Sequence, residues 1–470
     1  MHNHKPFKPL LPVTVALAIL SGGALSTSHA QSADALIQKL VDKGILTADE
    51  AKNLKAESDQ GFSKAYKSKT GLNDWVTALK VNGDFRGRFE QNSADSPEYT
   101  DRNRYRLRFR LGVTASLWDN FDVGLRLATG NPAVANGTLV GGQPITANQD
   151  LNSLESRKFI WVDAAYAKWT PINTATSGFS AMLGKFDNPF VLSPMVWDSD
   201  INPEGAAFTF SVSPFQKHTI KGIGAFIVLD EINQRSGAIP GLNPSSDPYI
   251  FGGQLLEESK WTENFETTLG IAAFNISNKG SLVGLTEPYV NSGTSRVPLA
   301  GLPAGAAGPL RYNMNPVIGS ASATYKLASM PMYPGKFPIK LSGEYMYNPG
   351  APDNNMGWRA GLTLGKAGKK KGWEVNYRYQ FLEGDAWFDA LTDDDNGAFY
   401  GTTHPSLANT GKTSGWFGGT NVKGHLIQGT YSFTDYMNFT FTYYLNDLII
   451  EAPGKNSDAA HFMADLMWKF

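Results

Sequence analysis

The chain contains segments of ten or more residues in which apolar and polar side chains alternate. In residues 103–113, NRYRLRFRLGV, aromatic and aliphatic residues occupy the odd positions and arginines occupy most of the even ones. Only an extended strand separates two such sets onto opposite faces, because its side chains alternate with a period of two. The pattern recurs in 371–381, 437–446 and 461–470, where the apolar face is rich in aromatic residues. The chain is therefore expected to consist mainly of long β-strands.

The length of these segments distinguishes a membrane barrel from a soluble sandwich. Strands of soluble proteins usually have about five or six residues, whereas a tilted strand that crosses a membrane needs about 9–11. The sequence has no apolar run long enough for a transmembrane helix. A mean hydropathy of −0.27 agrees with a barrel wall of which half lines water. These observations favour a transmembrane β-barrel.

Counting the alternating segments predicts an all-β fold, an antiparallel barrel of about 16 strands. The expected strands are 77–91, 103–118, 120–130, 157–170, 178–186, 205–213, 217–229, 248–260, 264–276, 316–328, 336–347, 356–366, 372–383, 422–433, 436–448 and 457–470. Short gaps, including those around Pro171 and Pro214, alternate with mostly long ones. This places both ends of the barrel on the periplasmic side and the long loops outside the cell.

The first 30 residues have the features of a secretory signal peptide. Lys5 and Lys8 precede an apolar run from Leu10 to Leu20, and Ser28-His29-Ala30 forms a small-residue cleavage site. The apolar run is too short to span a membrane. We expect cleavage after Ala30 and a mature protein in the outer membrane.

Residues 33–59 predict a short α-helical hairpin. Thr47 and Glu50 have the spacing of a capping box, which would open the second helix after a break at Gly44. Because the segment is exported and not strongly basic, we expect an oligomer, periplasmic or cell-wall contact rather than DNA binding. The predicted organisation is a signal peptide (1–30), a periplasmic hairpin and linker (31–75) and a barrel (76–470).

Composition and motifs exclude several other functions. The chain has no Cys, which excludes disulfides, thiolate metal sites and a catalytic thiol. A net charge of −1 gives no basic field for nucleic acid. Common hydrolase, zinc-protease and phosphate-loop motifs are missing, so we expect neither an enzyme nor a cofactor. The acidic run 393–397 lacks the spacing of a Ca²⁺-binding EF-hand loop and is interpreted as a solvated external loop.

Three regions resemble a known family. The stretches 101–132, 182–190 and 196–208, together with the hairpin sequence LIQKLVDKGILTADEAKNL, are similar to the putative porin family of Gram-negative outer-membrane proteins. The resemblance implies a large outer-membrane diffusion channel with a small periplasmic N-terminal segment. By analogy with classical porins, it suggests a homotrimer.

Two groups of charged residues are the candidate site. The third external loop, 187–204, corresponds to the loop that narrows classical porins, and its apolar middle could pack on the wall. The expected constriction-loop acids are Asp187, Asp198, Asp200 and Glu204. The expected pore-lining basic residues, which share the polar parity of the first three strands, are Arg86, Arg88, Arg104, Arg106, Arg108, Arg110 and Arg126.

Arginine is costly on the lipid face, so this set should face the interior, where Asp84, Glu90 and Asp122 would compensate part of its charge. The two groups predict a transverse field that selects solutes by charge. An alternative, in which the charges only pair and stiffen the wall, stays open.

The sequence therefore predicts an outer-membrane porin that lets small hydrophilic solutes and ions diffuse through a water-filled barrel. Its partners would be outer-membrane lipid and these solutes. Two alternatives are a substrate-specific anion channel and a structural protein that tethers the outer membrane through residues 33–59.

Overall fold

The computed structural model describes most of the barrel region and little of the N-terminal region. The described residues are 39–43, 46–47, 49–51, 53–54, 73–135, 138–231, 247–283, 291–298, 307–402, 404, 407 and 413–470. The chain divides into two units, Met1–Asp74 and Trp75–Phe470, and each is described by itself. The predicted signal peptide lies outside the described residues.

The described part of the N-terminal unit contains short helical segments. Residues 39–42, 49–51 and 53–54 are helical. The Thr47 hydroxyl and backbone amide both donate to a Glu50 carboxylate oxygen, at 2.7 and 2.9 Å, and the Glu50 amide donates back to the Thr47 hydroxyl at 3.3 Å. This is the reciprocal pattern of a capping box, and the hydrogen bonds from Thr47 lower the pKa of Glu50.

Sixteen long antiparallel strands form the barrel within the described residues. They are β1 (Val76–Ala94), β2 (Arg102–Leu117), β3 (Phe121–Thr129), β7 (Ile160–Asn173), β8 (Ser177–Lys185), β9 (Glu204–Phe215), β10 (His218–Val228), β11 (Tyr249–Lys260), β12 (Phe265–Ser277), β13 (Val317–Leu327), β14 (Phe337–Tyr347), β15 (Met356–Gly365), β16 (Trp373–Leu382), β19 (Val422–Ser432), β20 (Met437–Leu448) and β21 (Ala459–Lys469). The predicted fold class and strand number are confirmed.

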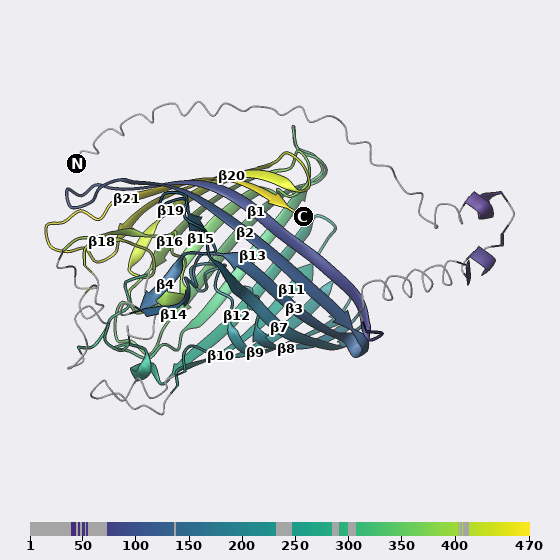
Figure 1. Ribbon diagram of the computed structural model, residues 1–470, viewed down its shortest axis with the longest axis horizontal. Helices are drawn as coiled ribbons and strands as arrows, with labels where there is room; N and C mark the ends of the chain where they lie inside the picture. Colours follow the sequence, from purple (N-terminus) through teal and green to yellow (C-terminus); the bar gives the residue numbers. More distant parts are fainter. Residues whose placement is uncertain are drawn as a thin grey trace. The chain divides into compact units, whose positions relative to one another are not determined.

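The barrel closes where the first strand pairs with the last. The β1–β21 register runs from Asp84 opposite Lys469 to Ala94 opposite Ala459. In Figure 1 the yellow strands β20 and β21 lie beside the dark blue β1. Closure satisfies the backbone hydrogen-bonding groups that the edge of an open sheet would expose to lipid. Because all pairings are antiparallel, the short turns lie at one end of the barrel and the long loops at the other.

The connections contain short elements that the sequence pattern did not predict. These are η1 (Trp118–Asn120), η3 (Lys279–Ser281), η4 (Asp389–Leu391), β4 (Pro132–Ala135), β5 (Thr138–Gly142), β6 (Gln149–Asp150), β17 (Ala398–Tyr400) and β18 (Gly415–Phe417). For β7 and β9, the predicted C-terminal end lies before the observed one. Pro171 lies within β7, where the β7–β8 register is irregular, and Pro214 lies within β9. Bulges and strand ends tolerate proline, so it did not mark the turns.

The outer face of the barrel is apolar. Exposed large side chains on this face include Val81, Tyr105, Leu183, Ile271 and Leu341. Val81, Tyr105 and Leu341 lie at the parity opposite to that of the buried polar residues of their strands, and Ile271 lies at the parity opposite to that of the buried Ala272 and Phe274. Among the described residues, no helix is both long and apolar enough to cross a membrane.

The inner face is not uniformly polar, contrary to the expectation from sequence. On β10, β11 and β12, inward residues such as Ile223, Ile227, Ile250 and Phe274 are buried in an apolar cluster. Loop residues complete this cluster, which reduces the space available to water inside the barrel. Alternation predicts which residues share a face, but it cannot show that a loop covers that face.

Two glycines of β10 make room for aromatic rings of the neighbouring strand. A Cβ atom at Gly224 would lie 2.3 Å from Cζ of Phe208, and one at Gly222 would lie 2.0 Å from Cε1 of Phe210. Both rings lie flat against β10 because these two positions carry no side chain.

We predict that Gly224→Leu destabilises the folded barrel, because the Phe208 ring must leave its place. Overpacking in a core costs about 1–3 kcal/mol, and the cost here should lie at the lower end, because Phe208 is 49% exposed on the outer face and its ring can turn aside. The temperature at which the compact band converts to the unfolded band in a semi-native gel measures the effect. Gly319→Leu is the matched control, since no heavy atom lies within 4 Å of a Cβ there. Equal conversion temperatures for the two variants would contradict the prediction.

Candidate functional site

The pairing of β1 with β2 brings arginines of the two strands side by side. Arg86 is the register partner of Arg108, and Arg88 is the partner of Arg106. Arg88, Arg106 and Arg108 are each more than nine-tenths buried. Like charges at this spacing repel one another, so the array requires nearby acids.

Carboxylates interleave with the arginines and provide this compensation. Asp84 accepts hydrogen bonds from Nε of Arg108 at 3.0 Å and from Nε of Arg110 at 2.7 Å. Glu90 accepts from Arg104 and, at 3.0 Å, from Nη1 of Arg106. Compensation by Asp84 and Glu90 agrees with the sequence prediction. Asp122 instead accepts a hydrogen bond from the Ser116 hydroxyl at 2.6 Å.

Two further acids belong to this array: parity alone predicts Asp465 as a lumen residue but not its partner, and the sequence pattern does not predict Asp150. Asp465, on the last strand, accepts two hydrogen bonds from Arg88, at 2.7 and 2.9 Å. Asp150, in β6, lies 2.9 Å from Nε of Arg106. Both depend on long-range pairing, of β21 with β1 and of β6 with β2, which the local pattern does not show.

Two of the seven predicted basic residues differ from the rest. Arg86 donates to the Asn148 side chain at 2.7 Å, and its nearest acid, Asp465, is 3.9 Å away. Arg126, on β3, pairs with Asp163 and with Asp187, the latter at 2.7 Å. Arg126 therefore belongs to a separate group of charges.

The third loop (residues 186–203) packs on the apolar inner wall. Met195 and Val196 are fully buried, and Trp197 and Phe190 are nearly so. Their cluster includes Phe274 of β12. Burial of each large apolar side chain contributes about 1.5–3 kcal/mol. Between Phe190 and Met195, polar groups of the loop also bind the wall. The Val191 amide donates to Gln254 of β11 at 2.8 Å, and the Ser193 hydroxyl donates to Glu344 of β14.

The seventh loop (residues 383–421) holds the third loop in this position. Nε1 of Trp387 donates to the Val196 carbonyl at 2.8 Å. The Asp198 amide donates to the Leu391 carbonyl at 2.7 Å, and the Asp393 amide donates to the Pro194 carbonyl at 3.0 Å. These backbone bonds form the junction of the two loops.

The four predicted loop acids lie in three different environments. Asp198 is buried at the loop junction. Asp200 lies 3.7 Å from Nη1 of Arg108. Asp187 pairs with Arg126, and Glu204 pairs with Lys185 at 2.7 Å; both acids are largely exposed. Of these four acids, Asp200 is the one that lies near an arginine of β1 and β2.

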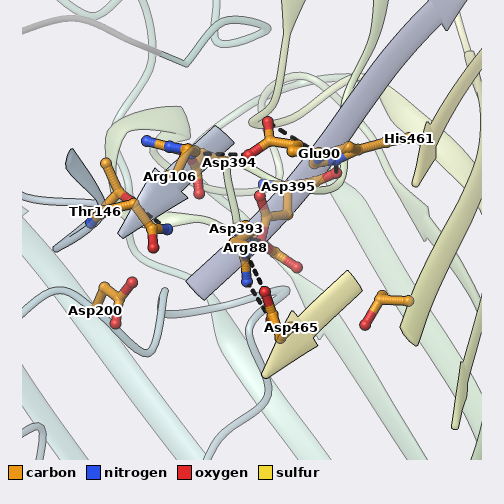
Figure 2. A network of polar contacts seen from close by, with 12 residues as sticks. Arg88, Glu90, Arg106, Thr146, Asp200, Asp393, Asp394, Asp395, His461 and Asp465 are labelled. Carbon is orange, nitrogen blue, oxygen red and sulfur yellow. Dashed lines mark hydrogen bonds and ion pairs between the residues drawn. The ribbon is translucent and has the colours of Figure 1, made fainter. Parts of the chain in front are cut away.

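The acids of the seventh loop are functional candidates that the sequence interpretation missed. Oδ2 of Asp395 lies 3.6 Å from Nη1 of Arg88, and Asp393 accepts a hydrogen bond from Arg378 of β16 at 3.1 Å. Figure 2 shows Asp393, Asp394 and Asp395 beside Arg88 and Arg106. The prediction of a solvated external loop is wrong for Asp393, which is 8% exposed. The apolar Trp387-Phe388 pair was the only local signal that this loop folds inward.

Burial and mutual repulsion shift the acids at the loop junction. Burial first, and then the neighbouring carboxyls, raise the pKa of Asp198 and of Asp394 well above the usual range. For Asp200, burial acts in the same direction, but Arg108 and Arg86 outweigh it and lower the pKa. The junction therefore favours protonated Asp198 and Asp394 next to an ionised Asp200.

One carboxylate oxygen from each of Asp198, Asp393 and Asp394 lies within 4.8 Å of the others. This spacing would suit a cation. The Asp198 oxygens already accept the amides of Asp200 and Asp394, at 2.7 and 3.4 Å, and Asp393 is paired with Arg378. The cluster is therefore explained as part of the loop junction.

Part of the barrel sequence matches a known protein family. Residues 96–283 match the putative porin family. The matched segment includes β2, the third loop and the strands through β12, and it confirms the resemblance inferred from sequence. Among curated proteins, none matches the chain.

Three solved structures match the chain at low sequence identity. The high-pH structure of Pseudomonas putida OprB has a TM-score of 0.48 and 10% identity, covering 86% of this chain and 96% of that one. Salmonella typhi OmpF in complex with daunomycin has a TM-score of 0.44 and 11% identity, covering 85% and 99%. A loop-deletion mutant of Vibrio cholerae OmpT has a TM-score of 0.43 and 9% identity, covering 84% and 99%.

We predict that the junction of the third and seventh loops is more stable in acid. Because the folded junction raises the pKa of Asp198 and Asp394, it holds protons that the separated loops would release. The stability of the loop junction should therefore fall as the pH rises from the usual pKa range of aspartate through the raised pKa values of Asp198 and Asp394. Hydrogen exchange of the Asp198 and Asp393 amides, corrected for intrinsic rates, measures this loss of protection.

The double variant Asp198→Asn/Asp394→Asn should remove most of this pH dependence, because the two amides have no proton to lose as the pH rises. Asp394→Asn alone should reduce it, since burial still raises the pKa of Asp198. Asp435→Asn, in a short turn at the other end of the barrel, is the control and should keep it. Protection that stays constant or increases with pH in the wild type would contradict the prediction.

Proposed function

We propose that this protein is an outer-membrane porin through which small hydrophilic solutes and ions diffuse passively. The match to the putative porin family and the closed sixteen-strand barrel support a channel. The charge selectivity is assigned to the arginines of β1 and β2 and to the acids of the two inward loops. Asp200 opposite Arg108 is the observation that carries this assignment, because it joins a wall charge to a loop charge across the interior.

Two ion pairs between the wall and the loops support a passage beside β1 and β2. Arg88–Asp395 and Arg108–Asp200 are 3.6 and 3.7 Å apart. Charges at such distances attract without a direct hydrogen bond, so water or a small ion can separate them at lower cost. Elsewhere the wall and the loops are joined directly, as in Arg378–Asp393 at 3.1 Å and Arg126–Asp187 at 2.7 Å.

A substrate-specific anion channel is the second candidate. Arg86 favours it, because this buried guanidinium has an amide rather than a carboxylate as its closest partner. A specific channel would show flux that saturates with solute concentration, whereas flux through a general porin would rise in proportion. A homotrimer and a periplasmic or cell-wall contact of residues 33–59 stay predictions from sequence.

We predict that Arg106→Ala and Arg108→Ala lower the anion preference and that Asp200→Asn raises it. Removing one charge about 7 Å from a passing ion changes the energy of that ion by about 0.6 kcal/mol in a water-like medium. Because the anion and the cation shift in opposite directions, their permeability ratio should change by roughly sevenfold. The reversal potential of purified protein in a planar bilayer under a KCl gradient measures this ratio.

Lys369→Ala, in an exposed turn at the opposite end from the long loops, is the control and should leave the reversal potential unchanged. If the arginine and aspartate variants all keep the wild-type reversal potential while conducting, the charges only stiffen the wall. In that case the selectivity assignment fails.

A further inference from the structure

The buried polar atoms of the barrel interior are not equally satisfied. On the β10–β12 side, the third loop meets the wall through apolar contacts and through paired groups such as Gln254 with Val191. On the β20–β21–β1–β2 side, several buried polar atoms have no hydrogen-bond partner among the described residues. Buried polar groups in folded proteins nearly always have a partner, so these atoms mark where a bound water or a polar solute would find hydrogen-bond partners if the loop moved aside.

Four residues at the extracellular end of this side carry such atoms. Both side-chain atoms of Asn92 are unpartnered, as are Nδ2 of Asn396, Nε1 of Trp416 and Oδ1 of Asn446. The three asparagines are each at most 4% exposed. Trp416 is only half-buried, so the group reaches the surface at this residue.

Strand pairing and loop contacts bring these four residues around His461. Asn92 is the register partner of His461 across β1 and β21. The Trp416 ring lies 5.2 Å from the His461 ring, edge to face. His461 Nδ1 hydrogen-bonds the Asp395 carbonyl at 3.0 Å, and Asn446 donates to the Gly397 carbonyl at 3.0 Å. Residues 395–397 therefore run over this corner of the barrel.

The unpartnered atoms continue along the wall toward the short-turn end. Nε of Arg104 and Nε of Arg86 are buried and without a hydrogen-bond partner. Beyond Arg86, the same face of β1 continues through Asp84 to Asn82 and Lys80, which are exposed. A row of polar groups thus leads from Trp416 at one end to Lys80 at the other.

Donors outnumber acceptors among these atoms. The unpartnered N–H groups belong to Arg86, Arg104, Arg106, Asn92, Asn396 and Trp416, whereas the unpartnered oxygen acceptors belong to Asn92, Asn446 and Asp150. Nε2 of His461, which can donate or accept, also has no hydrogen bond among the described residues, and Nε of Arg106 lies 2.9 Å from Oδ1 of Asp150. The nearby carboxylates Glu90 and Asp465 are already engaged by arginines. A row of free donors suits water and small anions, which accept hydrogen bonds, better than cations.

We propose that the permeation route is an off-axis hydrated seam between strands β20–β21–β1–β2 and the seventh loop, and that it favours small anions. The seam is defined by Trp416, Asn396, Asn446, Asn92, Arg104 and Arg86. The inference rests on the proposed channel function and adds to it the path and the solute class. The apolar cluster of the third loop closes the opposite side of the barrel.

Cysteine accessibility tests the seam directly, because the chain has no native Cys. Asn92→Cys on the wall and Asn396→Cys on the loop are treated with two small methanethiosulfonate reagents, one anionic and one cationic, during bilayer recording. Both thiols should react and reduce the conductance, and the anionic reagent should react at least about fivefold faster than the cationic one after correction for their intrinsic reactivities.

Met314→Cys is the matched control, since Met314 is fully buried in the apolar cluster inside the same barrel. It should react at least about tenfold more slowly than Asn92→Cys with either reagent. Asn446→Cys replaces Asn92→Cys if the latter does not give the compact band of a folded barrel.

If the channel conducts but the seam cysteines react as slowly as the Met314 control, the route is elsewhere and the inference fails while the porin function stands. Equal rates for the two reagents at Asn92→Cys would overturn the anion preference. An absence of conductance in the folded wild type would instead remove the proposed function itself.

Discussion

Closure of the sheet between β1 and β21 is the constraint on which the rest of the structure depends. A strand within lipid has no water for its backbone groups, so the sixteen strands must close. Closure pairs the N-terminal part of the barrel with its last strand and brings Asp465 to Arg88. That carboxylate joins Asp84, Glu90 and Asp150 in offsetting the repulsion among the arginines of β1 and β2. The same pairing that satisfies the backbone therefore makes a buried arginine array tenable.

The interior is asymmetric as a result of how the two inward loops are held. Apolar residues of the third loop pack against β10–β12, and the seventh loop fixes them through backbone bonds near Asp198 and Asp393. The acidic edge of both loops is thereby turned toward the arginines. One side of the barrel interior is apolar and the other is charged. The charged side contains buried polar atoms that have no partner among the described residues and that water can satisfy. This division explains how a lumen largely filled by loops can still conduct.

The sequence predicted the barrel well because its signal is local. Alternation in segments such as 103–113 determines strand, face and approximate length, and the alternating gap lengths determine the direction of each strand. The inward position of residues 393–395 could not be predicted, because it depends on contacts with Arg88 and Arg378 on distant strands. For the same reason Asp150 was missed, and Asp465 was predicted as a lumen residue from parity but not as the partner of Arg88. The sequence of β10 has apolar residues on both faces of the strand. Only the third loop packed against the inner face explains why that face is apolar.

The central claim is that this barrel forms an open, charge-lined passage, and the conductance of the wild-type protein in a planar bilayer tests it most directly. Protein whose folding is first established by its compact, heat-sensitive band should give discrete, ohmic conductance steps with a reversal potential on the anion side. Folded protein that gives no steps across a range of voltage and pH would contradict the account, because the loops would then seal the barrel.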